Sequence, residues 1–257
     1  MNSDLASAWG RHSVPHDDEQ TVHVGPLQLT FTRRGDELRL RWWRQGEPRP
    51  KARTWSRWAA PSDWDGSIHL RPSLPDRLVV VEPDVEFRLV QHAHARLFVR
   101  VPLWVDVSLR DRAKTPQVSL PTVVMSDTWW GSVEEGELGY ALPTFGRRRL
   151  SDSDYEEHLC ICPLQLENQS GEDLRVDKVA LRTQHLALYG RDTRIWANVT
   201  RVRYLGEDTG SRITVDSTAP TEAEGAGMLT ESRERSERSF TARTFARLRS
   251  TLGGGRR

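Results

Sequence analysis

Apolar and polar residues alternate at every second position along much of this chain, and that period restricts the fold more than any other feature. The segments 27–34 (LQLTFTRR) and 37–45 (ELRLRWWRQ) show it on either side of a glycine turn. Successive side chains of an extended strand point to opposite faces, so this period predicts strands with one buried face. The two segments are predicted to form a β-hairpin. Its buried face would hold Leu27, Leu29, Phe31, Leu38 and Leu40.

The same alternation recurs through the first half of the chain and, as in HLCICPLQLEN and RIWANVTRVRYLG, through the second. Short strands separated by Gly, Pro, Asp and Asn turns predict an all-β fold, an antiparallel β-sandwich that is jelly-roll-like or built of two packed sheets. Pro102 lies inside the longest alternating run, 95–110. Because proline cannot donate a ladder hydrogen bond, it predicts a bulge or an edge strand that bends between two sheets.

Composition predicts four regions. Residues 1–20 lack periodicity and are expected to be a disordered leader, 21–216 the β-sandwich domain, and the small, acidic stretch 217–230 a linker. Residues 231–257 are expected to form a short basic amphipathic helix, because Phe240, Thr244, Leu248 and Leu252 recur every four residues. The last twenty residues hold six arginines and no acid, so a net charge of +1 leaves −5 for residues 1–237.

Several classes of protein are disfavoured. There is no secretory signal pattern and no apolar run near the roughly 20 residues that span a bilayer, so a cytoplasmic location is predicted. Cys160 and Cys162 are interpreted as small core residues. His92 and His94 share a strand face without an evident third ligand, so no metal site and no cofactor are predicted. Phosphate-loop, dinucleotide, nucleophile-elbow and zinc-protease motifs are absent, which favours a protein that is not an enzyme.

The stretch SDTWWGSVEEGELGYALPT, residues 126–144, holds the strongest candidate site. A turn at 135–136 would make it a hairpin in which Trp129 and Trp130 point to opposite faces, one into the core and one outward. The outward ring either packs under another part of the chain or forms a ligand platform, with carboxylates beside it. The candidate binding residues are Asp127, Trp129, Trp130, Glu134, Glu137 and Tyr140.

A second aromatic concentration holds five of the ten tryptophans within 23 residues, interleaved with arginines. Such a mixture suits single-stranded nucleic acid, yet prolines in the same segment suggest a loop that its tryptophans hold against the sheet. Those tryptophans are Trp42, Trp43, Trp55, Trp58 and Trp64.

The hairpin segment also resembles a family of uncharacterised bacterial and archaeal proteins known as a domain of unknown function. The residues that carry the resemblance are Pro121, Thr122, Ser126, Asp127, Thr128, Trp129, Trp130, Gly131, Gly136, Glu137, Leu138, Tyr140, Pro143 and Thr144. Similarity extends to VPLWVDV and to LALYG through IWANVTRV, and so covers most of residues 25–216. The resemblance implies no assigned activity. It implies a soluble protein, sometimes encoded beside mechanosensitive-type channels, and hence a partner at the membrane.

These observations lead to one functional hypothesis and two alternatives. The first is a non-enzymatic binding or regulatory module for a protein partner, with a membrane channel as one candidate, acting through the hairpin and the basic tail. The second is a carbohydrate-binding or carbohydrate-active protein that uses Trp129 and Trp130. The third is nucleic-acid binding through the tryptophan and arginine segment and the arginine-rich tail.

Overall fold

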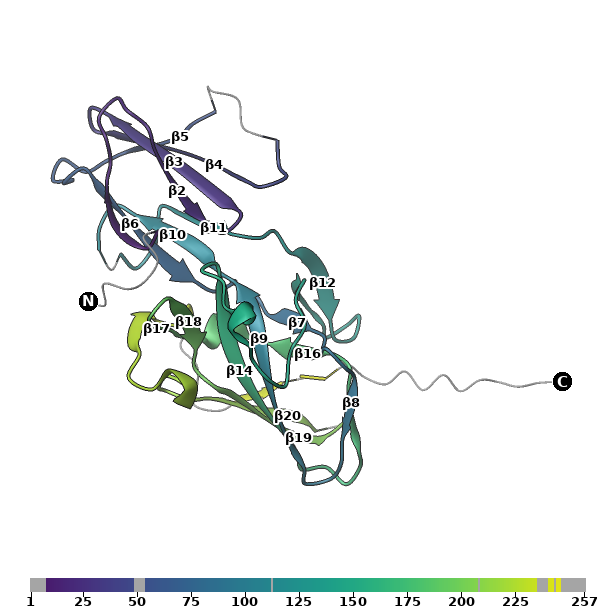
Figure 1. The fold of residues 1–257 in the computed structure, drawn as a ribbon. Helices are drawn as coiled ribbons and strands as arrows, with labels where there is room; N and C mark the ends of the chain where they lie inside the picture. The colour runs from purple at the N-terminus through teal and green to yellow at the C-terminus, as the bar shows by residue number, and fades with distance from the viewer. Residues whose placement is uncertain are drawn as a thin grey trace.

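A computed structural model describes residues 8–48, 54–111, 113–207, 209–234, 240–242 and 244–245. The regular structure of these residues consists of β-strands, with three short 3-10 turns at Asp152–Asp154, Thr183–His185 and Thr221–Ala223 (Figure 1). The predicted all-β, sandwich-like fold is confirmed. The strands form two packed units that succeed one another along the length of the molecule.

The first unit packs two four-stranded antiparallel sheets face to face. One sheet has the order β2 (Gln20–Val24), β3 (Leu27–Arg34), β4 (Glu37–Arg44) and β5 (Ser56–Ala59). The other has the order β1 (Gly10–Ser13), β6 (Ser67–Ser73), β10 (Trp104–Ser108) and β11 (Val118–Pro121). The predicted β3–β4 hairpin is confirmed, and its five predicted core residues are at most 1% exposed. They meet Ile68, Leu70, Val105 and Val107 from the opposite sheet.

The second unit contains an eight-stranded sheet centred on β14 (Leu159–Asn168). One side of β14 pairs with β9 (His94–Pro102), and the other pairs in parallel with β18 (Arg194–Ala197) and then β19 (Thr200–Gly206). The remaining strands of this sheet are β17 (Leu188–Arg191), β20 (Gly210–Val215), β21 (Gly227–Thr230) and β22 (Phe240–Ala242).

A four-stranded sheet covers the inner face of that large sheet. Its order is β12 (Ser126–Trp130), β13 (Glu137–Ala141), β7 (Val79–Val81) and β16 (Val179–Leu181), with β13 and β7 parallel. A two-stranded ribbon, β8 (Phe87–Leu89) with β15 (Leu174–Val176), completes the unit.

Pro102 marks the passage from one unit to the other. The strand β9 ends at this residue and β10 begins two residues later, after the fully buried Leu103. Since β9 pairs with β14 while β10 pairs with β6 and β11, the predicted bend between two sheets is confirmed.

The ends of the chain differ from the sequence-based expectation. Within the predicted leader, β1 pairs with β6, and the expected linker 217–230 contains a 3-10 turn and β21. The predicted C-terminal helix is not seen, because its described residues Phe240–Ala242 form a strand on β20, and the buried Phe245 packs against Tyr204. Tertiary pairing therefore overrides the local helix preference here. Residues 235–239, 243 and 246–257 of the predicted helix lie outside the described part.

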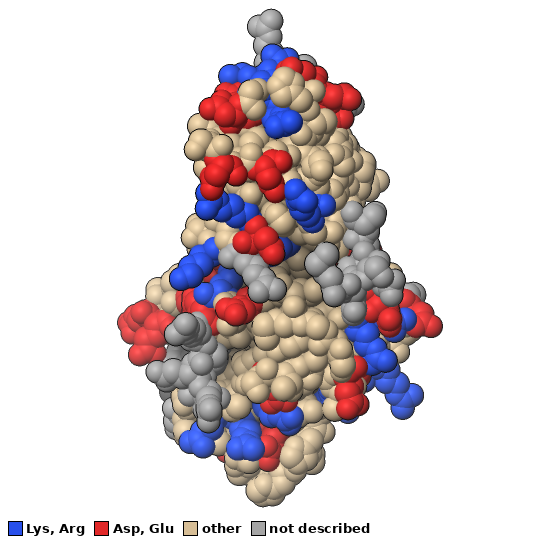
Figure 2. Space-filling model, turned by 90° about the vertical axis from the view of Figure 1, so that its left-hand side faces the viewer, with Lys and Arg blue, Asp and Glu red and all other residues tan. Residues whose placement is uncertain are grey.

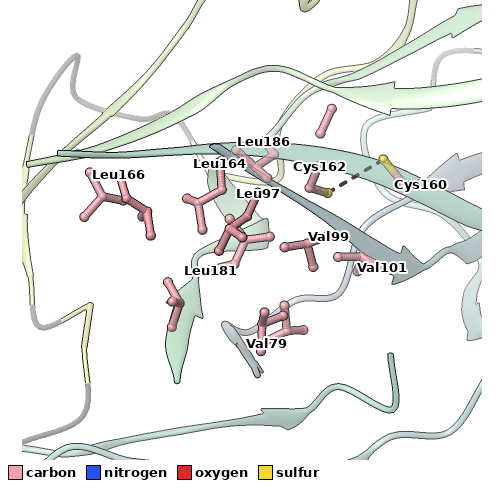
Figure 3. Close-up of a cluster of buried hydrophobic side chains, with 14 of the residues drawn as sticks. Val79, Leu97, Val99, Val101, Cys160, Cys162, Leu164, Leu166, Leu181 and Leu186 are labelled. Carbon is pink, nitrogen blue, oxygen red and sulfur yellow. Dashed lines mark hydrogen bonds between the residues drawn. The ribbon is translucent and has the colours of Figure 1, made fainter. Parts of the chain in front are cut away.

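Cys160 and Cys162 lie on the inner face of β14, among leucines and valines of the main core (Figure 3). Both are fully buried, and their sulfur atoms are 3.8 Å apart. Burial raises the pKa of the Cys160 thiol well above its usual value. Their interpretation as small core residues is confirmed.

The position of β14 at the centre of the larger sheet makes its core side chains the most sensitive to truncation. Leu164 is 0% exposed, whereas Val133, on the turn after β12, is 92% exposed. We expect Leu164→Ala to lower the free energy of unfolding by about 2–5 kcal/mol, because the residual cavity adds to the lost burial. The control Val133→Ala should stay within ~0.5 kcal/mol of the parent in urea unfolding. Equal effects of both substitutions would contradict the assigned core.

Candidate functional site

The residues singled out between 126 and 144 form an antiparallel hairpin. Its strands β12 and β13 pair with Trp129 opposite Leu138 and Trp130 opposite Glu137, and residues 131–136 make the connection. Gly131 supplies the positive φ of +110° that the turn requires and that other residues rarely adopt. The connection between the strands is longer than the predicted two-residue turn at 135–136. The pairing of the predicted strands is confirmed.

The tryptophan doublet divides as the alternation predicted. Trp130 is 7% exposed and packs with Leu78 and Ala180 in a small cluster on one face of the sheet. Trp129 is 52% exposed on the opposite face. Trp130 therefore anchors the hairpin in the protein, and Trp129 presents an aromatic surface to solvent.

Trp129 is held in place by its own turn. Its indole nitrogen donates a hydrogen bond to the carbonyl oxygen of Ser132 at 2.8 Å. Gly136 lies directly beneath the ring, since a Cβ at this glycine would come within 2.2 Å of the indole nitrogen. The ring is fixed before any ligand arrives, which lowers the entropy lost on binding.

The carboxylates of the hairpin differ in their partners. Glu137 forms a two-point ion pair with Arg182, which follows β16. Asp127 pairs with Arg77, the two charged groups being 3.4 Å apart. Glu134 is exposed at the tip. The hairpin thus keeps an acidic tip, while the two acids on its strands are neutralised by arginines from elsewhere in the chain.

Tyr140 connects the hairpin to the junction of the two units. Its hydroxyl donates to Asp76 at 2.8 Å, and its ring lies 6.3 Å from that of Trp104 at the start of β10. Burial, followed by the hydrogen bond and charge of Asp76, raises the pKa of Tyr140 to about 12. The residue is a neutral hydrogen-bond donor across the physiological range.

Three exposed apolar side chains gather at the outer end of the hairpin. Leu138 (43% exposed) is the cross-strand neighbour of Trp129, and Val133 (92% exposed) lies on the connecting turn. Cross-strand neighbours on one face lie about 5 Å apart. We call Trp129, Val133 and Leu138 the tip patch.

The second group of tryptophans lies in the first unit. Trp42, Trp58 and Trp64 pack against its core, Trp43 is 9% exposed, and Trp55 stacks beneath Arg41. The arginines between them are also engaged, since Arg41 bonds to Glu19 and Arg44 to the carbonyl of Pro121. The structure thus supports the packing interpretation for these tryptophans; residues 49–53 of the segment lie outside the described part.

The surface also lacks a broad basic region on the face shown in Figure 2, where basic and acidic residues intermingle over both units. A nucleic-acid phosphate chain is attracted by a continuous basic surface rather than by alternating charges.

The prediction that His92 and His94 share a strand face is wrong. His92 lies in a turn with a φ of +60°, whereas His94 is in β9. Among the described residues, no group of three or more His, Cys, Asp or Glu side chains could hold a metal ion.

A groove that sequence reasoning missed crosses the outer face of the large sheet. Its volume is about 470 Å³, and β9, β14 and β19 each contribute polar side chains to it. The cations are paired, as Arg96 bonds to Glu222, Arg201 to Asp216 and Arg203 to Glu167. The polar residues of the groove occupy the outward-facing positions of three alternating segments, and these positions are visible in the sequence. Only the order of the strands in the sheet brings the three segments together.

No helix in the described residues is long and apolar enough to cross a bilayer. Comparison with protein families gives a match over residues 8–249 to a family described as a protein of unknown function (DUF432). The chain belongs to this family. The resemblance drawn from the hairpin segment is therefore confirmed at the level of the family. No curated protein and no solved structure matches the chain. Within this family, function must be argued from the site itself.

The contact between Gly136 and Trp129 leads to a prediction about the tip. We expect Gly136→Ala to lower the free energy of unfolding by about 1–3 kcal/mol, because the added methyl group displaces the indole ring or the turn. The Trp129 indole N–H signal in the NMR spectrum should move as its bond to Ser132 is lost. Gly171→Ala is the control, since a Cβ there meets nothing within 4 Å. An unmoved indole signal in Gly136→Ala would contradict the close approach.

The raised pKa of Tyr140 leads to a second prediction. The folded state favours the neutral phenol, so this stabilisation is complete below pH 10.0, the usual value, and is lost as the pH rises towards about 12. The difference in phenolate absorbance between the parent and Tyr140→Phe should have its midpoint near pH 12 while circular dichroism reports a folded protein. Asp76→Asn should lower that midpoint. A midpoint at the usual value in the parent would refute the assignment.

Proposed function

We propose that this protein is a non-enzymatic binding module that recognises a protein partner through the β12–β13 hairpin. The observation that carries the proposal is the rigid, half-exposed ring of Trp129 beside Leu138, with the exposed Val133 on the connecting turn. Aromatic residues are enriched at protein interfaces, where a few rigid anchors supply most of the binding energy. A fixed tryptophan within an apolar patch has the character of such an anchor.

The polar groups of the hairpin favour this function over carbohydrate chemistry. Trp129 uses its N–H within the turn, and Asp127 and Glu137 are engaged by arginines. Acid and base catalysis on a glycosidic bond needs two carboxyl groups facing a shared substrate position, and sugar recognition needs polar groups free to bond hydroxyls. The apolar tip patch instead suits a protein surface.

The tryptophan and arginine segment gives little support to nucleic-acid binding. Three of its tryptophans pack against the core of the first unit, Trp43 is 9% exposed and Trp55 lies beneath Arg41. The basic tail, which also belongs to that hypothesis, lies mostly outside the described residues. We therefore assign the first role to the hairpin and propose a cytoplasmic protein. The resemblance to proteins encoded beside mechanosensitive-type channels makes the cytoplasmic part of such a channel the first partner to test.

The binding function can be tested by selecting a phage-displayed library of random peptides on the folded protein. We expect Trp129→Ala to weaken binding of the selected peptides about tenfold or more, since an aromatic anchor contributes about 2 kcal/mol or more. Phe145→Ala is a matched control, because Phe145 is also 52% exposed but lies outside the hairpin.

A glycan array and a titration with single-stranded nucleic acid test the two alternative functions. A glycan signal that disappears in Trp129→Ala, or salt-sensitive binding of nucleic acid that Trp129→Ala leaves unchanged, would replace the proposed function. Peptides that bind both variants equally would show that the tip patch is not the interface.

A further inference from the structure

The hairpin ends the four-stranded sheet with an uncovered strand edge. In the order β12-β13-β7-β16, the far edge at β16 is covered, because the amide of Ala180 bonds to the carbonyl of Thr244 and Val179 is bridged to Phe245. The edge at β12 has no such backbone partner within the described part of the chain. This strand lies at the periphery of the molecule in Figure 1.

The pairing of β13 determines which backbone groups this edge offers. The amides of Tyr140 and Leu142 donate to β7, at the carbonyls of Leu78 and Val80. Backbone groups alternate in direction along a strand, so Gly139 and its alternate neighbours on β13 face β12. Thr128, opposite Gly139, therefore points its backbone groups inward, and Asp127 and Trp129 point theirs outward.

Native edge strands usually carry features that prevent another strand from pairing with them, such as lysine, proline or a bulge. The strand β12, Ser126–Trp130, contains neither lysine nor proline, and its register with β13 is regular. Its one charged residue is Asp127. The N–H and C=O groups of Asp127 and Trp129 thus remain available to an additional strand.

The side chains beside this edge indicate what that strand would carry. Trp129 presents an exposed aromatic ring on one face of the hairpin, and the exposed carboxylate of Glu134 lies at the adjacent tip. An aromatic ring and a carboxylate both attract a cation. On the other face, Trp130 and Leu78 form an apolar cluster. A strand with arginine or lysine on one face and β-branched residues on the other would match both surfaces.

We propose that β12 accepts an extended segment of a partner protein as an additional strand, and that this segment alternates basic with β-branched apolar residues. The proposal rests on the binding function assigned to the hairpin and specifies how the partner is held. Main-chain hydrogen bonds to Asp127 and Trp129 supply affinity, and the alternating side chains supply specificity.

Charge selects against a second copy of this chain as the occupant. Residues 126–141 contain four acids and no basic residue, and Glu134 is exposed at the tip. Two such edges brought together would place acidic tips near one another, which opposes pairing. A basic strand gains from the same charges.

The decisive experiment compares Asp127→Pro with Asp127→Ala. Both substitutions remove the carboxylate, but only proline removes the outward N–H and sets its ring against an incoming strand, while the ladder to β13 is kept. The probe is an acetylated heptapeptide of alternating arginine and valine, measured by isothermal titration calorimetry. We expect Asp127→Pro to bind it about tenfold or more weakly than Asp127→Ala, from one lost hydrogen bond and the steric clash.

Further measurements keep the inference separate from the binding function. In the parent protein, the backbone amides of Asp127 and Trp129 should gain protection from hydrogen exchange when the peptide binds, which tests the proposal even where Asp127→Pro fails to fold. The same peptide with glutamate in place of arginine should bind far more weakly.

Equal binding by the two Asp127 variants together with a loss in Trp129→Ala would refute strand addition and leave the binding function standing. No binding of the arginine peptide, equal binding of the glutamate peptide, or a dimer in sedimentation that Asp127→Pro dissolves would overturn the proposed occupant. If the peptides selected by phage display bind the parent and Trp129→Ala equally well, the binding function itself is refuted.

Discussion

The extended chain from His94 to Ser108 is the constraint on which the rest of the structure depends. Its first part, β9, supplies Leu97, Val99 and Val101 to the core of the second unit, and its second part, β10, supplies Val105 and Val107 to the core of the first. The two cores therefore share one length of backbone, with the buried Leu103 at the junction. A change in the direction of this strand would move both sheets that pair with it.

The same strand places the candidate site. Trp104, the first residue of β10, contacts the ring of Tyr140 on the hairpin and lies beneath the guanidinium of Arg233, 5.4 Å from its ring centre. Arg233 also bonds to Ser73 on β6 and lies 3.6 Å from the buried carboxylate of Asp106. The base of the hairpin is thus packed at the junction of the units, and its outer end extends beyond the core. This explains why Trp129 is exposed on the face by which β7 and β16 pack against the main core.

Much of the fold could be predicted from the period of two, because the alternation reports directly on burial. It identified the β3–β4 hairpin, the opposed tryptophans and the bend at Pro102. It could not give the order of the strands, since alternation does not say which neighbour a strand takes, and the parallel pairing of β14 with β19 joins segments some 36 positions apart. The prediction of a C-terminal helix was wrong for a related reason. Phe240 and Thr244 have helical spacing, yet the free edge of β20 and a space in the core for Phe245 decide their conformation.

The site was predictable only in part. The residue types and the hairpin were visible in one short segment, but the arginines that neutralise Asp127 and Glu137 come from positions 77 and 182. The outward direction of the Asp127 and Trp129 backbone groups depends on the pairing of β13 with β7, which no local pattern reports. The groove across β9, β14 and β19 likewise exists only once three distant strands are adjacent.

The acidic character of the hairpin gives a reason why an uncovered edge can persist in this protein. An open edge is a hazard, because any extended chain can pair with it, and most proteins reduce that hazard with lysine or proline. Here the exposed acids at the tip discourage pairing between copies of the same chain, but they do so without blocking the backbone groups themselves. The protection is selective, since it acts through the sign of the charge and not through the geometry of the strand. A basic segment is therefore the kind of chain that this edge does not repel, and the ring of Trp129, fixed over Gly136, belongs to the edge strand itself.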